Sequence, residues 1–107
     1  MAELIFWLFV GHFLGDYILQ TDYIAKNKCS DWYIMFIHCF LYTAVIVFIL
    51  IALGLTNRIW LMGWIVFGSH VPLDIAKCQG LWPAKYALAI DQIAHLIILL
   101  IIGVYAL

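Results

Sequence analysis

Each of the four histidines in the chain has an aspartate or a tyrosine four residues away. The four pairs are His12 with Asp16, His38 with Tyr42, His70 with Asp74, and Asp91 with His95. Side chains at this spacing lie on one face of a helix. If all four segments are helical, each helix therefore presents one polar stripe, and each stripe contains one histidine.

Imidazoles and carboxylates in such stripes are ligands for a divalent ion such as zinc, manganese or iron. Tyr42 and Gln92 would be supporting donors. The predicted metal ligands are His12, Asp16, His38, His70, Asp74, Asp91 and His95; Asp16, Asp74 and Asp91 would serve as ligands or as a general base. Seven candidates suffice for one ion with supporting carboxylates, or for two ions. Metal-bound water attacks esters, amides and phosphoesters, so the first hypothesis is a metal-dependent hydrolase of a lipid or lipid-linked substrate.

Two other interpretations use the same residues. In a transport or channel element, the polar side chains would relay protons or hold an ion. In a structural or partner-binding membrane subunit, they would join helices by hydrogen bonds. Stoichiometric metal would separate the first hypothesis from the structural one, and pH-dependent conductance would identify the transport element.

The composition places these side chains in a membrane. Of 107 residues, 68% are hydrophobic and 10% are charged, with a mean hydropathy of +1.12. A soluble domain is typically about half apolar and about a quarter charged, so the apolar faces here must meet a lipid bilayer. We predict an all-α integral membrane protein with no nucleic-acid partner. Its aromatic residues and small-residue patches are compatible with a homo-oligomer.

Four apolar stretches approach the length of about 20 residues that a membrane-spanning helix needs. The chain is therefore predicted to be a single transmembrane domain over 1–107, a bundle of about four helices over 4–20, 32–53, 59–76 and 86–105. The first helix is expected to be retained rather than cleaved as a signal peptide, because Glu3 precedes its apolar stretch and no Lys or Arg does.

The polar residues share one depth in this bundle. All seven ionisable candidates fall in the half nearest the connections 21–31 and 77–85, whereas 45–53 and 96–104 are apolar. The blocks Gly11–Asp16 and Ser69–Asp74 also resemble each other, with a small residue, a histidine and an aspartate at matching places. This similarity predicts a weak parallel repeat of two helices, with a polar site at the interface.

Basic residues predict an orientation. The connections 21–31 and 77–85 carry four lysines, whereas the connection between them carries only Arg58. By the positive-inside rule, both lysine-bearing loops are expected in the cytoplasm, with the termini outside the inner (cytoplasmic) membrane. Cys29, Cys39 and Cys78 are odd in number and lack a metal-binding spacing, so free thiols are predicted.

Several blocks together resemble a family of small bacterial and phage membrane proteins that is catalogued only as a domain of unknown function. They are 11–22 (GHFLGDYILQTD), 26–28, His38 with Tyr42 and Thr43, 69–77 (SHVPLDIAK) and 91–95 (DQIAH). This resemblance covers essentially the whole chain and implies no activity. More distantly, the Ser69-His70-x-x-x-Asp74 block resembles membrane-bound metal-dependent hydrolases of bacteria, whose further histidine motifs this chain lacks.

Overall fold

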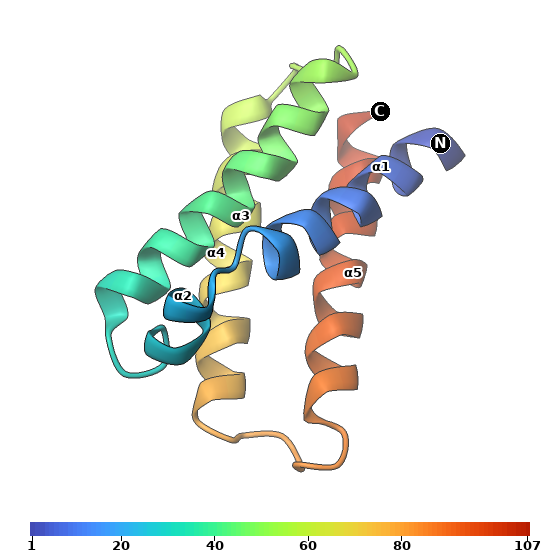
Figure 1. Cartoon of the computed structure of the whole chain (residues 1–107). Helices are drawn as coiled ribbons and strands as arrows, with labels where there is room; N and C mark the ends of the chain where they lie inside the picture. Colours follow the sequence, from blue (N-terminus) through green and yellow to red (C-terminus); the bar gives the residue numbers. More distant parts are fainter.

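A computed structural model describes all 107 residues, and it contains helices and no strands. The predicted all-α class is confirmed. The elements in chain order are α1 (Ala2–Phe13), the π-helical turn η1 (Leu14–Ile18), α2 (Asp22–Asn27), α3 (Trp32–Ala52), α4 (Ile59–Cys78) and α5 (Ala87–Ala106) (Figure 1).

Three of these helices are long and apolar enough to cross a membrane. The mean hydropathy is 2.7 for α3, 1.4 for α4 and 2.3 for α5, and each has 20 or 21 residues. At 1.5 Å per residue, such helices match the hydrocarbon core of about 30 Å. Large apolar side chains such as Trp60 and Phe48 point outward, with 83% and 71% of their surface exposed. The chain is therefore a membrane protein.

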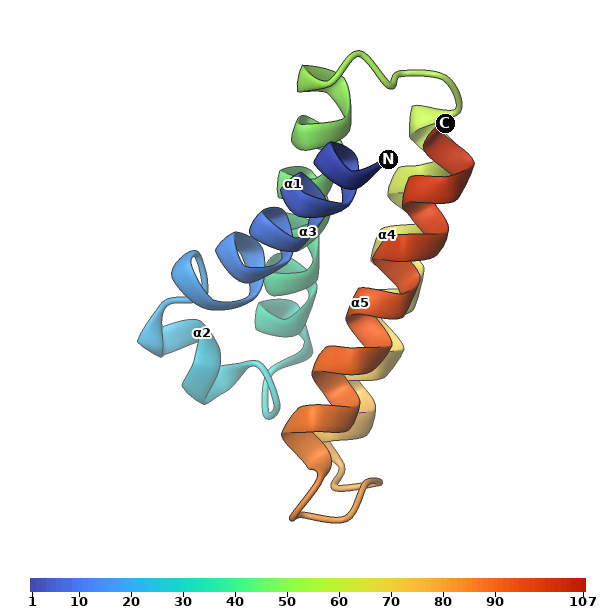
Figure 2. The same cartoon turned by 90° about the vertical axis from the view of Figure 1, so that its right-hand side faces the viewer.

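The fourth member of the bundle is formed by α1 and η1, which together cover 2–18. It crosses the bundle at a steep tilt to α5 (Figures 1 and 2). The four helices form a closed cycle, in which α1 and α4 each pack against both α3 and α5. Both termini lie at one end of the bundle, and α2 and the α4–α5 connection lie at the other (Figure 1).

An apolar core fills the half of the bundle nearest the termini. Its buried members are Leu4, Leu8, Tyr42, Ile46, Leu50, Met62, Val66, Leu99, Ile102 and Ala106. They come from α1, α3, α4 and α5, so every helix of the cycle contributes. This distribution agrees with the predicted apolar half and leaves the other half for polar side chains.

Glycines allow α1 to approach α3 closely. A Cβ on Gly15 would lie 3.0 Å from Tyr42 Cδ2 and 3.3 Å from Tyr42 Cα, and one on Gly11 would collide with Ile49 Cδ1. Small residues four apart commonly permit such approach between membrane helices. Asp16 directly follows Gly15, so this contact brings Asp16 to the interior of the bundle.

The helix widens where Asp16 is located. The backbone N–H of Leu19 donates to the Leu14 carbonyl, five residues earlier, at 2.9 Å. π-Helical turns of this kind are rare and occur frequently at functional sites.

A disulfide joins Cys29, just after α2, to Cys78, the last residue of α4, with their Cα atoms 5.4 Å apart. The prediction of free thiols is therefore wrong for these two residues and holds for Cys39, which is free and buried. The residues lie 49 positions apart, and only the packing of the 21–31 connection against the end of α4 brings them together.

Candidate metal centre

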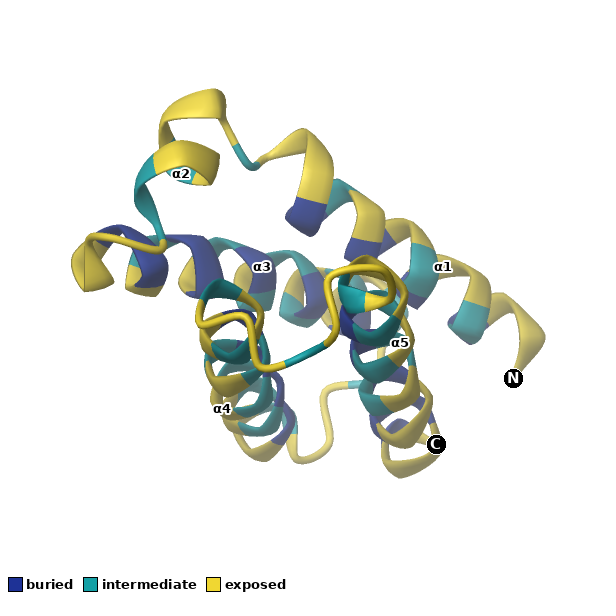
Figure 3. Ribbon diagram, turned by 90° about the horizontal axis from the view of Figure 1, so that it is seen from below, coloured by how far each residue is buried: buried dark blue, intermediate teal, exposed yellow.

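All seven predicted ligands are buried, with at most 7% of any residue's surface exposed. Seen from the loop end, the buried positions of α1, α3, α4 and α5 face the interior of the bundle (Figure 3). The histidines and aspartates thus form one enclosed polar layer between the apolar core and the loops.

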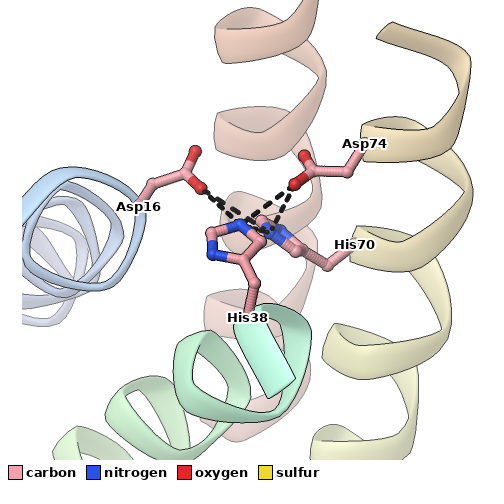
Figure 4. Close-up of side chains that lie close together, drawn as sticks. All are labelled: Asp16, His38, His70 and Asp74. Atoms are coloured by element: carbon pink, nitrogen blue, oxygen red, sulfur yellow. Dashed lines mark hydrogen bonds and ion pairs between the residues drawn. The ribbon is translucent and has the colours of Figure 1, made fainter. Parts of the chain in front are cut away.

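Four of the side chains converge on one point. Asp16 from η1, His38 from α3, and His70 and Asp74 from α4 direct their polar atoms toward one another (Figure 4). Nε2 of His38 lies 3.3 Å from Asp16 Oδ1 and 3.0 Å from Asp74 Oδ2. Nε2 of His70 lies 3.6 Å and 3.5 Å from the same two oxygens, and the two imidazole nitrogens are 3.1 Å apart.

Five of the six ligand–ligand separations in this group agree with a tetrahedral metal site. Ligands bound tetrahedrally at 2.0–2.1 Å from zinc are about 3.3 Å from one another. The five separations between 3.0 and 3.6 Å are distributed around that value. The four residues Asp16, His38, His70 and Asp74 therefore form a group that could hold a metal ion. We call them the four-ligand group.

A second group adjoins the first. Asp16, Asp91 and His95 also offer ligand atoms that all lie within 4.8 Å of one another. Asp91 and His95 both come from α5, one helical turn apart. Nδ1 of His95 lies 2.7 Å from the Asp91 main-chain carbonyl and 3.5 Å from Asp91 Oδ1. The structure therefore brings six of the seven predicted ligands into two groups that share Asp16.

His12, the seventh predicted ligand, has a hydrogen-bond partner at each ring nitrogen. The Gln92 amide nitrogen, Nε2, donates to Asp91 Oδ2. The amide oxygen of Gln92, Oε1, therefore lies 2.7 Å from His12 Nε2, and because an amide oxygen can only accept, His12 Nε2 donates to it. His12 Nδ1 consequently accepts from the Tyr42 hydroxyl at 2.8 Å. No lone pair of His12 is left for a metal in this arrangement, although its Nε2 is only 3.9 Å from Asp16 Oδ2.

Tyr42 supports two of the histidines. Its hydroxyl binds His12, and its ring stacks on the His70 imidazole with centroids 4.0 Å apart and planes at 17°. It is also the residue against which Gly15 packs. Tyr42 therefore positions His70 and determines how close η1 comes to α3.

Two lysines from the loop end neutralise part of the layer. Lys28 Nζ lies 3.1 Å from Asp74 Oδ2, and Lys77 Nζ lies 3.5 Å from Asp91 Oδ2. Nothing in the sequence spacing connects Lys28 to Asp74, which lies 46 residues away. Only the folding of the 21–31 connection over the layer shows that it belongs to the site.

The fold and the site together define a class: an all-helical membrane protein with a buried His/Asp cluster that could hold a metal ion. Residues 4–107 match the model of a family described as a protein of unknown function (DUF3307), and the chain belongs to that family. No curated protein matches the chain. No solved structure matches it either.

Proposed function

We propose that this protein binds a divalent transition-metal ion within the membrane through Asp16, His38, His70 and Asp74, and that it is a metal-dependent hydrolase of a lipid or lipid-linked substrate. The observation that carries the proposal is the convergence of two imidazole nitrogens and two carboxylate oxygens at tetrahedral separations.

Hydrogen bonds alone satisfy this arrangement poorly. Ionised carboxylates only accept, and a ring nitrogen carries at most one proton. Nε2 of His38 faces two carboxylate oxygens and a second imidazole nitrogen, but its single N–H can point at only one of them. A cation at the centre would contact all four ligand atoms at once. Imidazole with carboxylate favours zinc, manganese or iron.

The hydrolase part of the proposal depends on the position of the layer. The ligands lie toward the loop end of the bundle, on the side of α2 and the α4–α5 connection, where a lipid headgroup could reach them. A metal ion at such a site would supply an activated water and polarise the scissile group. Of the three aspartates predicted to be catalytic, Asp91 alone lies outside the four-ligand group.

A structural network is the second candidate, and the lysine pairs favour it. Lys28 and Lys77 compensate two of the three carboxylates. A proton on one histidine would balance the third, and the layer would then join the helices without an ion. Interhelical hydrogen bonds in membranes contribute about 0.6 kcal/mol each on average. In that case the layer would stabilise the bundle without binding metal.

Metal analysis of the purified protein separates the two candidates. We expect the wild-type protein to carry at least about one equivalent of zinc, manganese or iron per chain. His38→Ala and His70→Ala should each lose this metal. The control is Lys85→Gln, since the Lys85 ammonium group lies over the Tyr86 ring and not beside the polar layer. A wild-type protein that stays metal-free after incubation with each ion would support the structural network and exclude the metallohydrolase.

We further propose that the protein lies in the cytoplasmic membrane with the loops at 21–31 and 77–85 outside. This reverses the orientation expected from the lysines, for two reasons. Lys28 and Lys77 are paired with buried aspartates and are not free loop charges. Disulfides such as Cys29–Cys78 also persist in oxidising compartments and are rare in the cytosol.

A further inference from the structure

Asp16 and Asp74 each stand between the two ligand groups. Asp74 Oδ2 faces His38 and His70, while its other oxygen, Oδ1, lies 3.6 Å from His95 Nε2. Asp16 Oδ1 faces His38 and His70, and Asp16 also belongs to the group with Asp91 and His95. Asp74 thus offers one oxygen to each group, and Asp16 is a member of both groups. Carboxylates shared in this way are the bridging ligands of two-metal centres.

We propose that a second divalent ion binds between Asp16, Asp91 and His95, and that the Asp16 and Asp74 carboxylates bridge it to the ion of the four-ligand group. The polar layer is then a dinuclear centre. The inference rests on the proposed function for the first ion. It goes further in assigning the residues of α5 to a separate ion.

Two unpartnered polar atoms support the second ion independently of the spacing. Asp91 Oδ1 and His95 Nε2 are buried and have no hydrogen-bond partner, and their residues are only 1% and 3% exposed. A buried polar atom without a partner costs free energy, because it has lost its hydrogen bonds to water. A cation between these atoms would remove that cost at both.

Neighbouring hydrogen bonds prepare both atoms as ligands. The main-chain carbonyl of Asp91 can only accept, so His95 Nδ1 carries the proton and Nε2 carries the lone pair. A metal-bound histidine typically donates its other N–H to a carbonyl or carboxylate in this way. The Gln92 amide likewise occupies Asp91 Oδ2 and leaves Oδ1 free. His12 holds Gln92 in this orientation, so we assign it as a positioning residue.

With both bridges in place, each ion would have four protein ligands. Asp16, His38, His70 and Asp74 would hold the first ion, and Asp16, Asp91 and His95 together with Asp74 Oδ1 would hold the second. Catalytic zinc sites can expand to five ligands in the transition state, and a fifth position would admit water.

Lys77 competes with the second ion for Asp91. Its ammonium group lies 3.5 Å from Asp91 Oδ2, and it is 38% exposed, so it can turn to solvent when an ion arrives. Removing this positive charge should tighten the second site. Lys85 is the matched control, because its ammonium group lies over the Tyr86 ring rather than beside an aspartate.

The test is a manganese titration of the purified full chain in detergent. Equilibrium binding measures the number of ions, and electron paramagnetic resonance measures whether they are coupled. We expect about two ions per wild-type chain, with the spectrum of a spin-coupled pair. Asp91→Asn and His95→Gln should each bind about one ion and give the spectrum of an isolated ion. Lys77→Gln should bind the second ion several-fold more tightly than wild type, and Lys85→Gln should not differ from wild type.

The outcomes separate this inference from the proposed function. One ion per wild-type chain, unchanged in Asp91→Asn, would overturn the dinuclear centre and leave the four-ligand site standing. No ion at all would overturn both. Circular dichroism shows whether Asp91→Asn and His95→Gln fold. If they do not, the manganese titration of Lys77→Gln decides. A manganese affinity of Lys77→Gln equal to that of wild type then counts against the second ion.

Discussion

The disulfide between Cys29 and Cys78 holds together the two chain segments whose lysines reach into the polar layer. Lys28 directly precedes Cys29 and pairs with Asp74, and Lys77 directly precedes Cys78 and pairs with Asp91. One covalent link at the loop end therefore fixes the approach of two cations to two candidate ligands.

Metal removal should lower the thermal stability of the wild type. Without an ion, three carboxylates and four imidazoles share one poorly hydrated layer, where like charges repel and unpaired ions lose solvation. Adding zinc or manganese should raise Tm in a concentration-dependent way, because the ion binds only the folded state. Thermal unfolding in detergent, with chelator and with graded ion, measures the effect.

Asp16→Asn is the informative variant in that experiment. Asp16 is the carboxylate that neither Lys28 nor Lys77 pairs with, so the chelated variant should melt at or above the temperature of chelated wild type while losing its response to metal. Wild type that melts identically under both conditions, with Asp16→Asn merely less stable, would favour the structural network.

Gly15→Ala should destabilise the bundle and weaken metal binding together. The added Cβ would press on the Tyr42 ring and backbone, and overpacking of this kind costs about 1–3 kcal/mol. Moving η1 away from α3 would also withdraw Asp16 from the four-ligand group. Gly68→Ala is the control, since nothing lies within 4 Å of its added Cβ. Equal melting temperatures and metal affinities in the two variants would show that the close approach is unimportant.

Metal affinity should fall as the pH is lowered. A histidine must be neutral to bind a metal, and an ordinary imidazole titrates near pH 6.5. Protons therefore compete with the ion for His38 and His70, and the apparent Kd should rise as the pH falls. Zinc titrations between neutral and mildly acidic pH measure this. An affinity independent of pH would mean that the histidines are not ligands.

Cysteine labelling should place the disulfide side of the bundle outside the cell. Single cysteines at Asn27 and Gln79, introduced with Cys29, Cys39 and Cys78 replaced by serine, should react with an impermeant reagent added to intact cells. A cysteine at Asn57 should react only after permeabilisation. The reverse pattern would restore the orientation expected from the lysine count. It would also mean that the disulfide does not persist in the reducing cytoplasm.

The helices and the candidate ligands follow from local sequence. Long apolar stretches can only be helical in lipid, where each backbone group must find its partner within the segment. The helix positions of α3, α4 and α5 were therefore predictable to within a few residues. A four-residue spacing places a histidine and its aspartate on one helix face wherever the helix goes. For this reason the polar layer itself could be predicted from the sequence.

Tertiary structure decided which of these side chains meet, and it did so through contacts that no spacing encodes. The tilt of α1, the approach of Gly15 to Tyr42 and the widened turn η1 bring Asp16 to His38. Hydrogen bonds to Tyr42 and Gln92 remove His12 from the set of available ligands. The Cys29–Cys78 disulfide and the Lys28–Asp74 pair join segments more than 40 residues apart. The separation of one layer into two ligand groups depends on helix rotations and tilts, and these are set only when all four helices pack together.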